Sequence, residues 1–336
     1  MLPSMFSGIS GLKANQKKLD VVGNNIANSS TTAFKSQRIR FQDMVSQNVS
    51  EALGPGQNTG GVNGRQVGLG VQIAGIDTNT AVGNMQPTSR SLDAAIDGSG
   101  YFIVAKGKLD TDSATTRLEV DETEHTLVRG AVLSTSFTRD GSFTLDSQGN
   151  LLTSDGYRVL GYTVGNAAIT YSSDPNVQGS VAFQDANNSD ELIADQTGLV
   201  PLVIPDSIEG NRVQSFSIEK DGLLKAVLAD GSVAALGQVA MASFKNDAGL
   251  KKLGKNLYQN SANSGEPVLR SGIGAETDVD NSKGYGDMLQ GMLEMSNVDL
   301  AEQFTDMIIA SRAFQANGKI ISTGDEILQD LVNLKR

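Results

Sequence analysis

The sequence predicts an α+β protein in which long N- and C-terminal helices pack as a coiled-coil-like pair, with a central antiparallel β-domain between them. Near both termini, apolar residues recur every seven positions, a pattern that keeps one side of a helix facing a partner helix. Between the termini the hydrophobic period falls toward two and Asp-Gly pairs recur. That combination is typical of antiparallel strands joined by tight turns.

The first helix is expected over residues 4–28, with Ser4 as its N-cap. Its apolar stripe consists of Met5, Leu12, Leu19, Val22 and Ile26. The helix should end in the run 24–30, because Asn and Ser favour turns. The inner helical domain at this end spans residues 1–30. An extended connector is expected over 31–90, with a Gly-rich loop at 54–70.

The central β-domain is expected at residues 91–164 and 213–286. Three Asp-Gly pairs mark its turns, namely Asp97-Gly98, Asp140-Gly141 and Asp155-Gly156. Between the two halves lies a polar stretch, 165–212, which we interpret as an inserted outer lobe.

The last helix is expected to start near Ser296, with Asp299 three residues later in a capping box. It contains no proline before about Leu334, so it could reach about 55 Å. The helical domain at this end is assigned to residues 287–336. The apolar repeat is Leu293, Leu300, Met307, Phe314, Ile321 and Leu328, and Phe304 extends it.

The two stripes together predict a self-assembly surface. Chain ends usually fray, so two patterned helices there need partners, which we expect to be each other and copies of the same chain. The surface comprises Met5, Leu12, Leu19, Val22, Ile26, Leu300, Phe304, Met307, Phe314, Ile321 and Leu328. Residues 1–40 are mainly basic and residues 285–336 mainly acidic. Either these are ordinary solvated faces, or they attract each other and select the partner.

Composition narrows the function. A net charge of −11 argues against nucleic acid as a partner, because phosphates need a basic face. No stretch reaches the ~20 apolar residues of a membrane span, and the start of the sequence shows no pattern of a cleaved secretory signal. Zero cysteine excludes disulfides and thiolate sites. We expect no enzyme activity, no cofactor and no metal.

The chemistry-bearing residues are few. His125 is the only histidine, and we interpret it as a solvated loop residue. Asp278, Asp280 and Ser282 resemble the opening of a calcium loop, but Leu289 stands where a glutamate is required. A secreted β-rich enzyme, or an adhesin binding through 165–212, remains a remote alternative.

Two motifs resemble the axial proteins of the bacterial flagellum, the rod and hook family. The first is Gly23-Asn-Asn-Ile-Ala-Asn-Ser-Ser-Thr-Thr-Ala-Phe-Lys35, and the second opens the last helix at 296–317. Asn24, Asn25, Asn28, Phe34 and Lys35 carry the first motif. Two departures occur in it. Ser29-Ser30 stands where the family often has Val-Asn, and Ala33 stands where it usually has Gly.

Within the family the resemblance is greatest to hook subunits, on residues 34–47 and on Gln66-Val-Gly-Leu-Gly-Val71. The chain length also leaves room for an extra lobe. Distal rod subunits share the end motifs and are the alternative. The resemblance implies an extracellular homopolymer, exported by the flagellar type III apparatus. It would contact the distal rod, the hook cap and the hook–filament junction proteins, enclose the export channel and couple the motor to the filament.

Overall fold

The computed structural model describes residues 2–56, 60–109, 117–121, 124–127, 133–165, 167–172, 174, 177–187, 192–276 and 278–334. It divides into two compact units. Unit 1 contains residues 1–30, 35–80 and 297–336, and unit 2 contains residues 31–34 and 81–296. Each unit is therefore assembled from segments far apart in the sequence.

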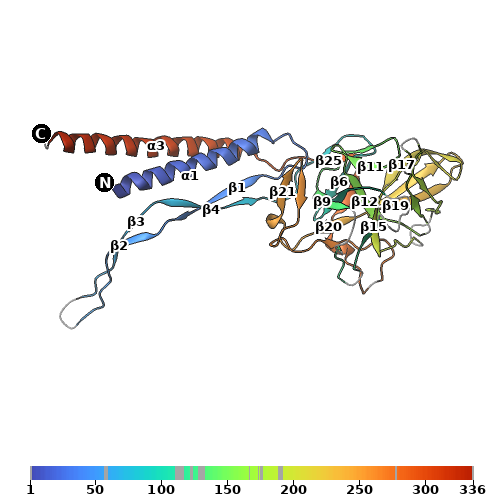
Figure 1. Ribbon diagram of the computed structural model, residues 1–336, viewed down its shortest axis with the longest axis horizontal. Coiled ribbons are helices and arrows are strands. Elements are labelled where there is room, and N and C mark those ends of the chain that lie inside the picture. Colours follow the sequence, from blue (N-terminus) through green and yellow to red (C-terminus); the bar gives the residue numbers. More distant parts are fainter. Residues whose placement is uncertain are drawn as a thin grey trace. The chain divides into compact units, whose positions relative to one another are not determined.

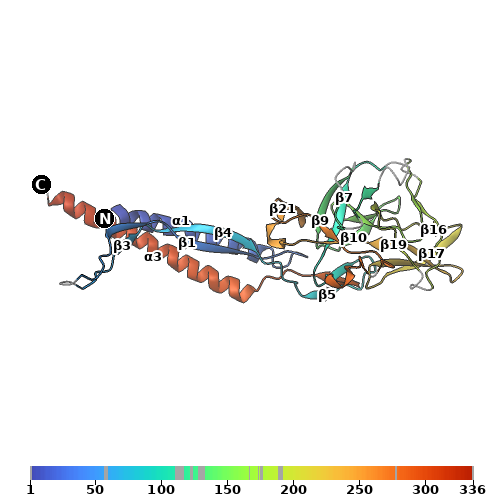
Figure 2. The ribbon, with the colours of Figure 1, turned by 90° about the horizontal axis from the view of Figure 1, so that it is seen from below.

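Unit 1 contains the two long helices, α1 (Leu2–Ala27) and α3 (Leu300–Asn333). They lie side by side in both views (Figures 1 and 2). Lys18 of α1 bonds Asp306 of α3 at 2.9 Å, whereas a Cβ on Gly8 would touch Ile321 at 3.4 Å. Contacting residues have increasing numbers along α1 and decreasing numbers along α3, so the two helices are antiparallel. Helices at both ends of the chain are confirmed.

The last helix begins later than expected, and Ser296 is not its start. Asp299 is the N-cap, and its side chain accepts hydrogen bonds from the backbone N–H groups of Ala301 and Glu302. Residues 287–299 are not helical either. They contain β24 (Asp287–Gln290) and β25 (Met292–Glu294), so Leu293 fits the heptad spacing but lies in a strand. At its other end the chain enters α1 at Leu2, two residues before the expected cap.

The expected extended connector contains a long antiparallel ribbon. β1 (Gln37–Asp43) pairs with β4 (Val71–Thr78), and β2 (Ser46–Ser50) pairs with β3 (Arg65–Gly68). The apolar residues in this stretch alternate with polar ones, which suits strands exposed on one face. The Gly-rich stretch begins after β2 and includes β3. Gly70, at its end, has a φ of +127° and lies against Ser10 of α1, where a Cβ would collide.

Unit 2 is built from short strands. They are β5 (Met85–Pro87), β6 (Ala94–Asp97), β7 (Tyr101–Lys106), β8 (Leu118–Glu119), β9 (Ser134–Thr138), β10 (Phe143–Leu145), β11 (Leu151–Thr153), β12 (Arg158–Tyr162), β13 (Ile169–Thr170), β14 (Ser180–Val181), β15 (Gly198–Pro201), β16 (Ser207–Ile208), β17 (Asn211–Ile218), β18 (Leu223–Leu228), β19 (Val233–Val239), β20 (Met241–Ser243), β21 (Lys251–Gly254), β22 (Leu257–Gln259), β23 (Val268–Leu269), β24 and β25. The described residues of this unit also contain the 3₁₀ turns η2 (Asp247–Gly249) and η3 (Ser282–Gly284).

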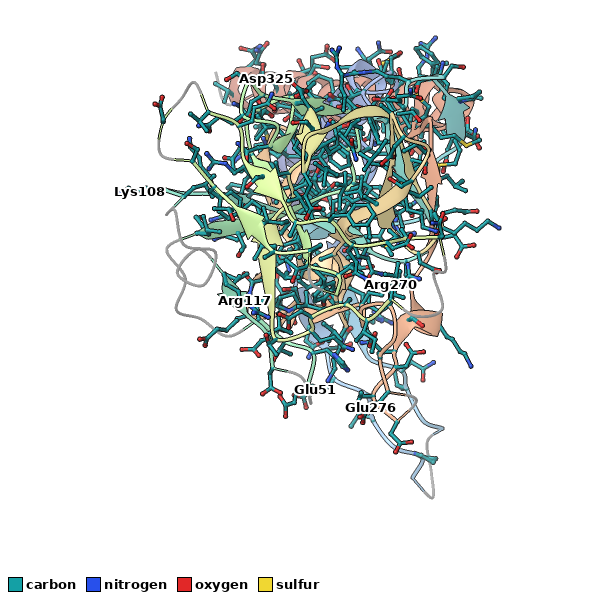
Figure 3. All side chains as sticks on the ribbon, turned by 90° about the vertical axis from the view of Figure 1, so that its right-hand side faces the viewer. Glu51, Lys108, Arg117, Arg270, Glu276 and Asp325 are labelled. Atoms are coloured by element: carbon teal, nitrogen blue, oxygen red, sulfur yellow. The ribbon has the colours of Figure 1, made fainter. Side chains whose placement is uncertain are left out.

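Most of these strands join one antiparallel sheet, whose main path runs β16-β17-β18-β19-β12-β7-β9-β22-β21. Both faces of this sheet are covered. Along the central strand β7, Phe102 and Val104 belong to one buried cluster, whereas Tyr101 and Ile103 belong to the other. Successive side chains of a strand point to opposite faces, so one hydrophobic cluster lies on each face of the sheet. Lys108, Arg117 and Glu276 lie at the periphery of this unit (Figure 3).

The described residues of 165–212 share the two buried clusters of unit 2, and they do not form a separate core. Ile169 and Tyr171 join one buried cluster of unit 2, and Leu192 and Leu199 join the other. The Tyr171 hydroxyl donates to the carbonyl of Pro201 at 2.7 Å. The described part of this stretch therefore belongs to the β-domain. The sequence did not reveal this, because the stretch is mainly polar and its apolar residues are scattered.

The three Asp-Gly pairs have different roles. Asp155-Gly156 joins β11 to β12, which pair as a hairpin, as expected. Asp97-Gly98 and Asp140-Gly141 do not, because β6 pairs with β24 and β9 pairs with β7 and β22. A Cβ on Gly141 would collide with the carbonyl of Ala94. Glycine therefore permits close backbone approach there.

Candidate self-assembly surface

Asn25 connects three elements of unit 1. Its Nδ2 donates to the carbonyl of Gln37 at 2.7 Å and to Oε1 of Gln303 at 2.9 Å, and its Oδ1 accepts from the Gln37 N–H at 3.0 Å. The side chain is fully buried. A buried amide is tolerated only when its donors and acceptors are paired, so this residue fixes α1 against β1 and α3.

The other signature residues have local roles. Asn28 Nδ2 donates to the carbonyl and to Oδ1 of Asn24, at 2.9 and 3.0 Å, and this closes the end of α1. The Lys252 ammonium lies 4.6 Å from the centre of the Phe34 ring. Burial lowers the pKa of Lys252. Lys35 is buried at 1% exposure.

The eleven residues of the predicted surface fall into two groups. Leu300, Phe304 and Phe314 are 43, 46 and 40% exposed. The others are buried or half-buried within unit 1: Val22 is buried, and Met5, Leu12, Leu19, Ile26, Met307, Ile321 and Leu328 are half-buried. The heptad pattern therefore marks the packing inside one subunit as well as a free face.

A second exposed face of α3 escaped the heptad pattern. Ile309, Ile320 and Ile327 are 55, 49 and 45% exposed, and their spacings of 11 and 7 residues align them on one side of a helix. Ile320 and Ile327 line a groove of about 490 Å³, together with Ser4, Ala316, Lys319, Thr323 and Gly324. Scoring the 3.6-residue period instead of a strict heptad would have found this line.

The exposed apolar residues continue beyond these two lines. On α3, Ile308 is 59% exposed, and on α1 Phe6 is 64% and Ile9 is 38% exposed. Single exposed apolar residues are normal, but contiguous patches on a surface mark interaction sites. Two apolar lines on one helix therefore favour docking of another apolar surface.

Asn297 is a contact that the sequence reasoning missed. Its Oδ1 accepts from the N–H of Ser36 at 2.8 Å, and its Nδ2 donates to the carbonyl of Asn79 at 2.9 Å. It lies two residues before the Asp299 cap and within the motif that resembles the family. The motif was therefore the available signal, although it does not reveal the partners.

The described residues contain no group of three or more His, Asp or Glu side chains that could hold a metal ion. No helix within the described ranges is long and apolar enough to cross a membrane. The solvated position expected for His125 is wrong. Its side chain is 8% exposed, and Nε2 lies 2.8 Å from the carbonyl of Val279.

Three families match separate parts of the chain. Residues 5–35 match the family described as flagella basal body rod protein, and residues 289–334 match the flagellar basal body rod FlgEFG protein C-terminal family. Residues 127–226 match the flagellar hook protein FlgE/F/G D1 domain. The two end matches cover most of α1 and all of α3, and the middle match lies in unit 2.

The relatives span the whole chain. The flagellar basal-body rod protein FlgG of Bacillus subtilis (strain 168) is 40% identical, with all of both chains covered. In Borreliella burgdorferi, the rod protein FlgG is 32% identical and the flagellar hook protein FlgE 30% identical, again over all of both chains. These are structural proteins of the flagellum and not enzymes. The chain belongs to the flagellar rod and hook family of axial structural proteins.

Proposed function

We propose that this chain is a structural subunit of the flagellar hook. Copies polymerise into a flexible tube that joins the rod to the filament and encloses the export channel. The main support for polymerisation is the pair of apolar lines on α3, which are exposed in the single subunit. Burying apolar surface between copies is favourable, at roughly 25 cal/mol per Å².

The proposed interface is the set of exposed residues on the two terminal helices. Leu300, Phe304 and Phe314 form one line, and Ile309, Ile320 and Ile327 form the other. The buried and half-buried members of the predicted surface lie within unit 1, which leaves the two lines of α3 exposed. A subunit of this kind would leave the cell unfolded through the type III apparatus and assemble outside it, against the distal rod, the hook cap and the junction proteins.

The hook assignment rests on sequence. The segment 34–47 and the Gln66–Val71 motif are similar to hook subunits. The distal rod is the second candidate, and the alignments favour it. Those with the two rod relatives extend over 336 and 337 residues, close to the 336 of this chain. The alignment with the Borreliella hook protein extends over 453 residues, so that relative carries segments which this chain lacks.

Polymerisation is tested by placing a charge on the exposed face. Phe314→Asp should prevent assembly of purified protein, as judged by sedimentation and electron microscopy, while the near-ultraviolet circular dichroism of the folded β-structure stays unchanged. Gln259→Asp is the control, because it adds the same charge at an exposed position of unit 2, outside both lines of α3. Normal tubes from Phe314→Asp would remove this face from the interface.

Hook and rod are separated by deleting the gene and examining isolated basal bodies. A hook subunit predicts basal bodies that retain a complete rod and end without a hook. A rod subunit predicts a shortened rod. Purified polymers give an independent result, because a hook subunit should form curved tubes and a rod subunit straight ones.

A further inference from the structure

A buried ion pair lies inside unit 2. Nη1 of Arg139 is 3.2 Å from Oε2 of Glu294, and the two side chains are 4% and 0% exposed. Removing two charges from water costs free energy, which is recovered only when good geometry and additional hydrogen bonds satisfy both groups. The partners of this pair therefore indicate what it holds.

Arg139 binds the turn after β6. Its Nη1 donates to the carbonyl of Ile96 at 3.2 Å, and its Nη2 donates to the carbonyl of Gly98 at 2.6 Å. The guanidinium also lies 5.3 Å from the centre of the Tyr101 ring, a cation–π geometry. Arg139 thus joins its own turn to two neighbouring strands of the core.

Glu294 binds two further segments. Its Oε1 accepts from the N–H of Gly83 at 2.9 Å, and its backbone carbonyl accepts from the N–H of Ala33 at 2.8 Å. The next residue, Met295, donates its N–H to the carbonyl of Asn84 at 2.9 Å. Residues from three distant parts of the sequence therefore meet at one carboxylate and its backbone.

These three segments are the places where the chain enters and leaves unit 2. Residues 31–34 belong to unit 2 although the segments on either side belong to unit 1, and the remainder of unit 2 runs from 81 to 296. Ala33, Gly83 and Glu294 each lie close to such a passage. The Glu294 carboxylate therefore binds the segment at Gly83, its backbone binds the segment at Ala33, and Arg139 anchors the carboxylate in unit 2.

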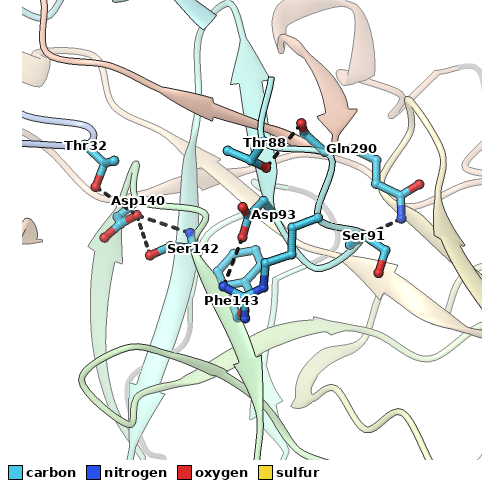
Figure 4. A network of polar contacts seen from close by, with 10 residues as sticks. Thr32, Thr88, Ser91, Asp93, Asp140, Ser142, Phe143 and Gln290 are labelled. Atoms are coloured by element: carbon cyan, nitrogen blue, oxygen red, sulfur yellow. Dashed lines mark hydrogen bonds and ion pairs between the residues drawn. The ribbon is translucent and has the colours of Figure 1, made fainter. Parts of the chain in front are cut away.

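The short segment 31–34 has additional anchors in unit 2. The Thr32 hydroxyl donates to Oδ1 of Asp140 at 3.4 Å, as Figure 4 shows. Asn256 Nδ2 donates to the carbonyl of Thr32 at 3.0 Å. With Phe34 under Lys252, the segment is fixed at several points.

We propose that Arg139 and Glu294 form a clamp that holds together, as one rigid structure, the three segments through which the chain enters and leaves unit 2. The consequence for function rests on the proposed axial polymer. In that polymer, mechanical load passes between the two units through these three segments. The clamp holds the segments together, so they bear the load as one rigid structure and not separately.

The test measures hydrogen exchange of the full-length monomer, so it does not depend on assembly. The double variant Arg139→Met/Glu294→Leu replaces the pair by apolar side chains of similar size, which often preserves stability. We expect the amide of Gly83 to exchange about ten- to hundredfold faster, in line with the loss of its hydrogen bond to a charged group. The amide of Ala33 should also exchange faster, because its acceptor is the backbone carbonyl of residue 294 and that backbone is no longer fixed by the ion pair. Amides of β18 and β19 should keep their rates.

Lys225→Met is the matched control, because it removes a different ion pair of unit 2, with Glu219 at 2.8 Å. Native rates at Gly83 and Ala33 in the double variant would overturn the clamp, as would an equal acceleration throughout unit 2. If the double variant fails to fold, Glu294→Gln provides the measurement, since the new amide oxygen can still accept from Gly83. Selective acceleration at Ala33 then supports the clamp, and unchanged exchange there refutes it. Tube formation is scored separately, so failure of the polymer leaves this result intact.

Discussion

Nδ2 of Asn25 in α1 lies 2.9 Å from Oε1 of Gln303 in α3, and the same amide group bonds both backbone polar groups of Gln37. One buried side chain thus determines how two helices and a strand of unit 1 meet. The family signature is explained here by geometry, since no other side chain of this size offers both donors and acceptor.

Asn25→Ala should therefore destabilise unit 1 by about 2–4 kcal/mol, because it leaves polar groups of Gln37 and Gln303 buried without partners. Urea unfolding, followed by the helical signal, measures the loss. Asn24→Ala is the control, because Asn24 is exposed, and it should cost less than about 1 kcal/mol. Equal losses in both variants would contradict the role of Asn25.

Ala33 has a φ of +55° and is 1% exposed. The left-handed conformation costs an L-residue about 1–2 kcal/mol, whereas burial of the methyl group returns about 0.8 kcal/mol. Ala33→Gly should therefore leave the unfolding free energy within about 1 kcal/mol of its native value. Ala33→Val should cost more than about 2 kcal/mol, because β-branched residues rarely adopt this conformation. Thermal unfolding of both variants tests this, and native stability in the Ala33→Val variant would refute it.

The long helices were predictable because their period is a local property of the sequence. Their ends were less so. Leu293 continues the heptad spacing, yet it lies in β25, which pairs with β5. A single apolar residue fits either period, and its pairing partner, Gln86, lies in a distant part of the sequence. The start of α3 moved to Asp299 because the carboxylate can reach two free N–H groups there.

The candidate surface was predicted only in part. A strict heptad identifies one line of a helix, and it found Phe314 but missed Ile309, Ile320 and Ile327. The hydrogen bonds of Asn25 could not be derived, since they depend on where β1 and α3 lie in the fold. Asp-Gly pairs were ambiguous for a similar reason, because glycine serves both tight turns and close backbone approach.

Alkaline pH should destabilise unit 2. Burial raises the pKa of Tyr258 from 10.0 to about 12, and burial also raises the pKa values of Tyr101, Tyr162 and Tyr171. The unfolded chain ionises first, so this contribution is fully present below about pH 10 and is lost as the pH rises through about 12. Each such tyrosine lowers stability by about 1.4 kcal/mol per pH unit in that window.

Urea unfolding at a series of pH values measures this slope. Tyr258→Phe should reduce the slope above about pH 10 and leave stability at neutral pH nearly unchanged, because Phe keeps the packed ring. The same slope in the variant and in the native chain would show that Tyr258 does not contribute.

Gly318 lies inside α3, and a Cβ placed there would meet no atom within 4 Å. Glycine lowers the stability of a helix by about 1 kcal/mol relative to alanine. No contact within the described part of the subunit requires a glycine at this position. Gly318→Ala should thus stabilise the α3 of a monomer by about 1 kcal/mol, as measured by thermal unfolding. If a second copy packs closely against this position, the same variant should raise the protein concentration needed for polymerisation. Gly324→Ala is the comparison, because its Cβ would already touch Met5 at 3.3 Å and should gain less. A stabilised monomer that polymerises at the native concentration would place Gly318 outside the contacts between copies.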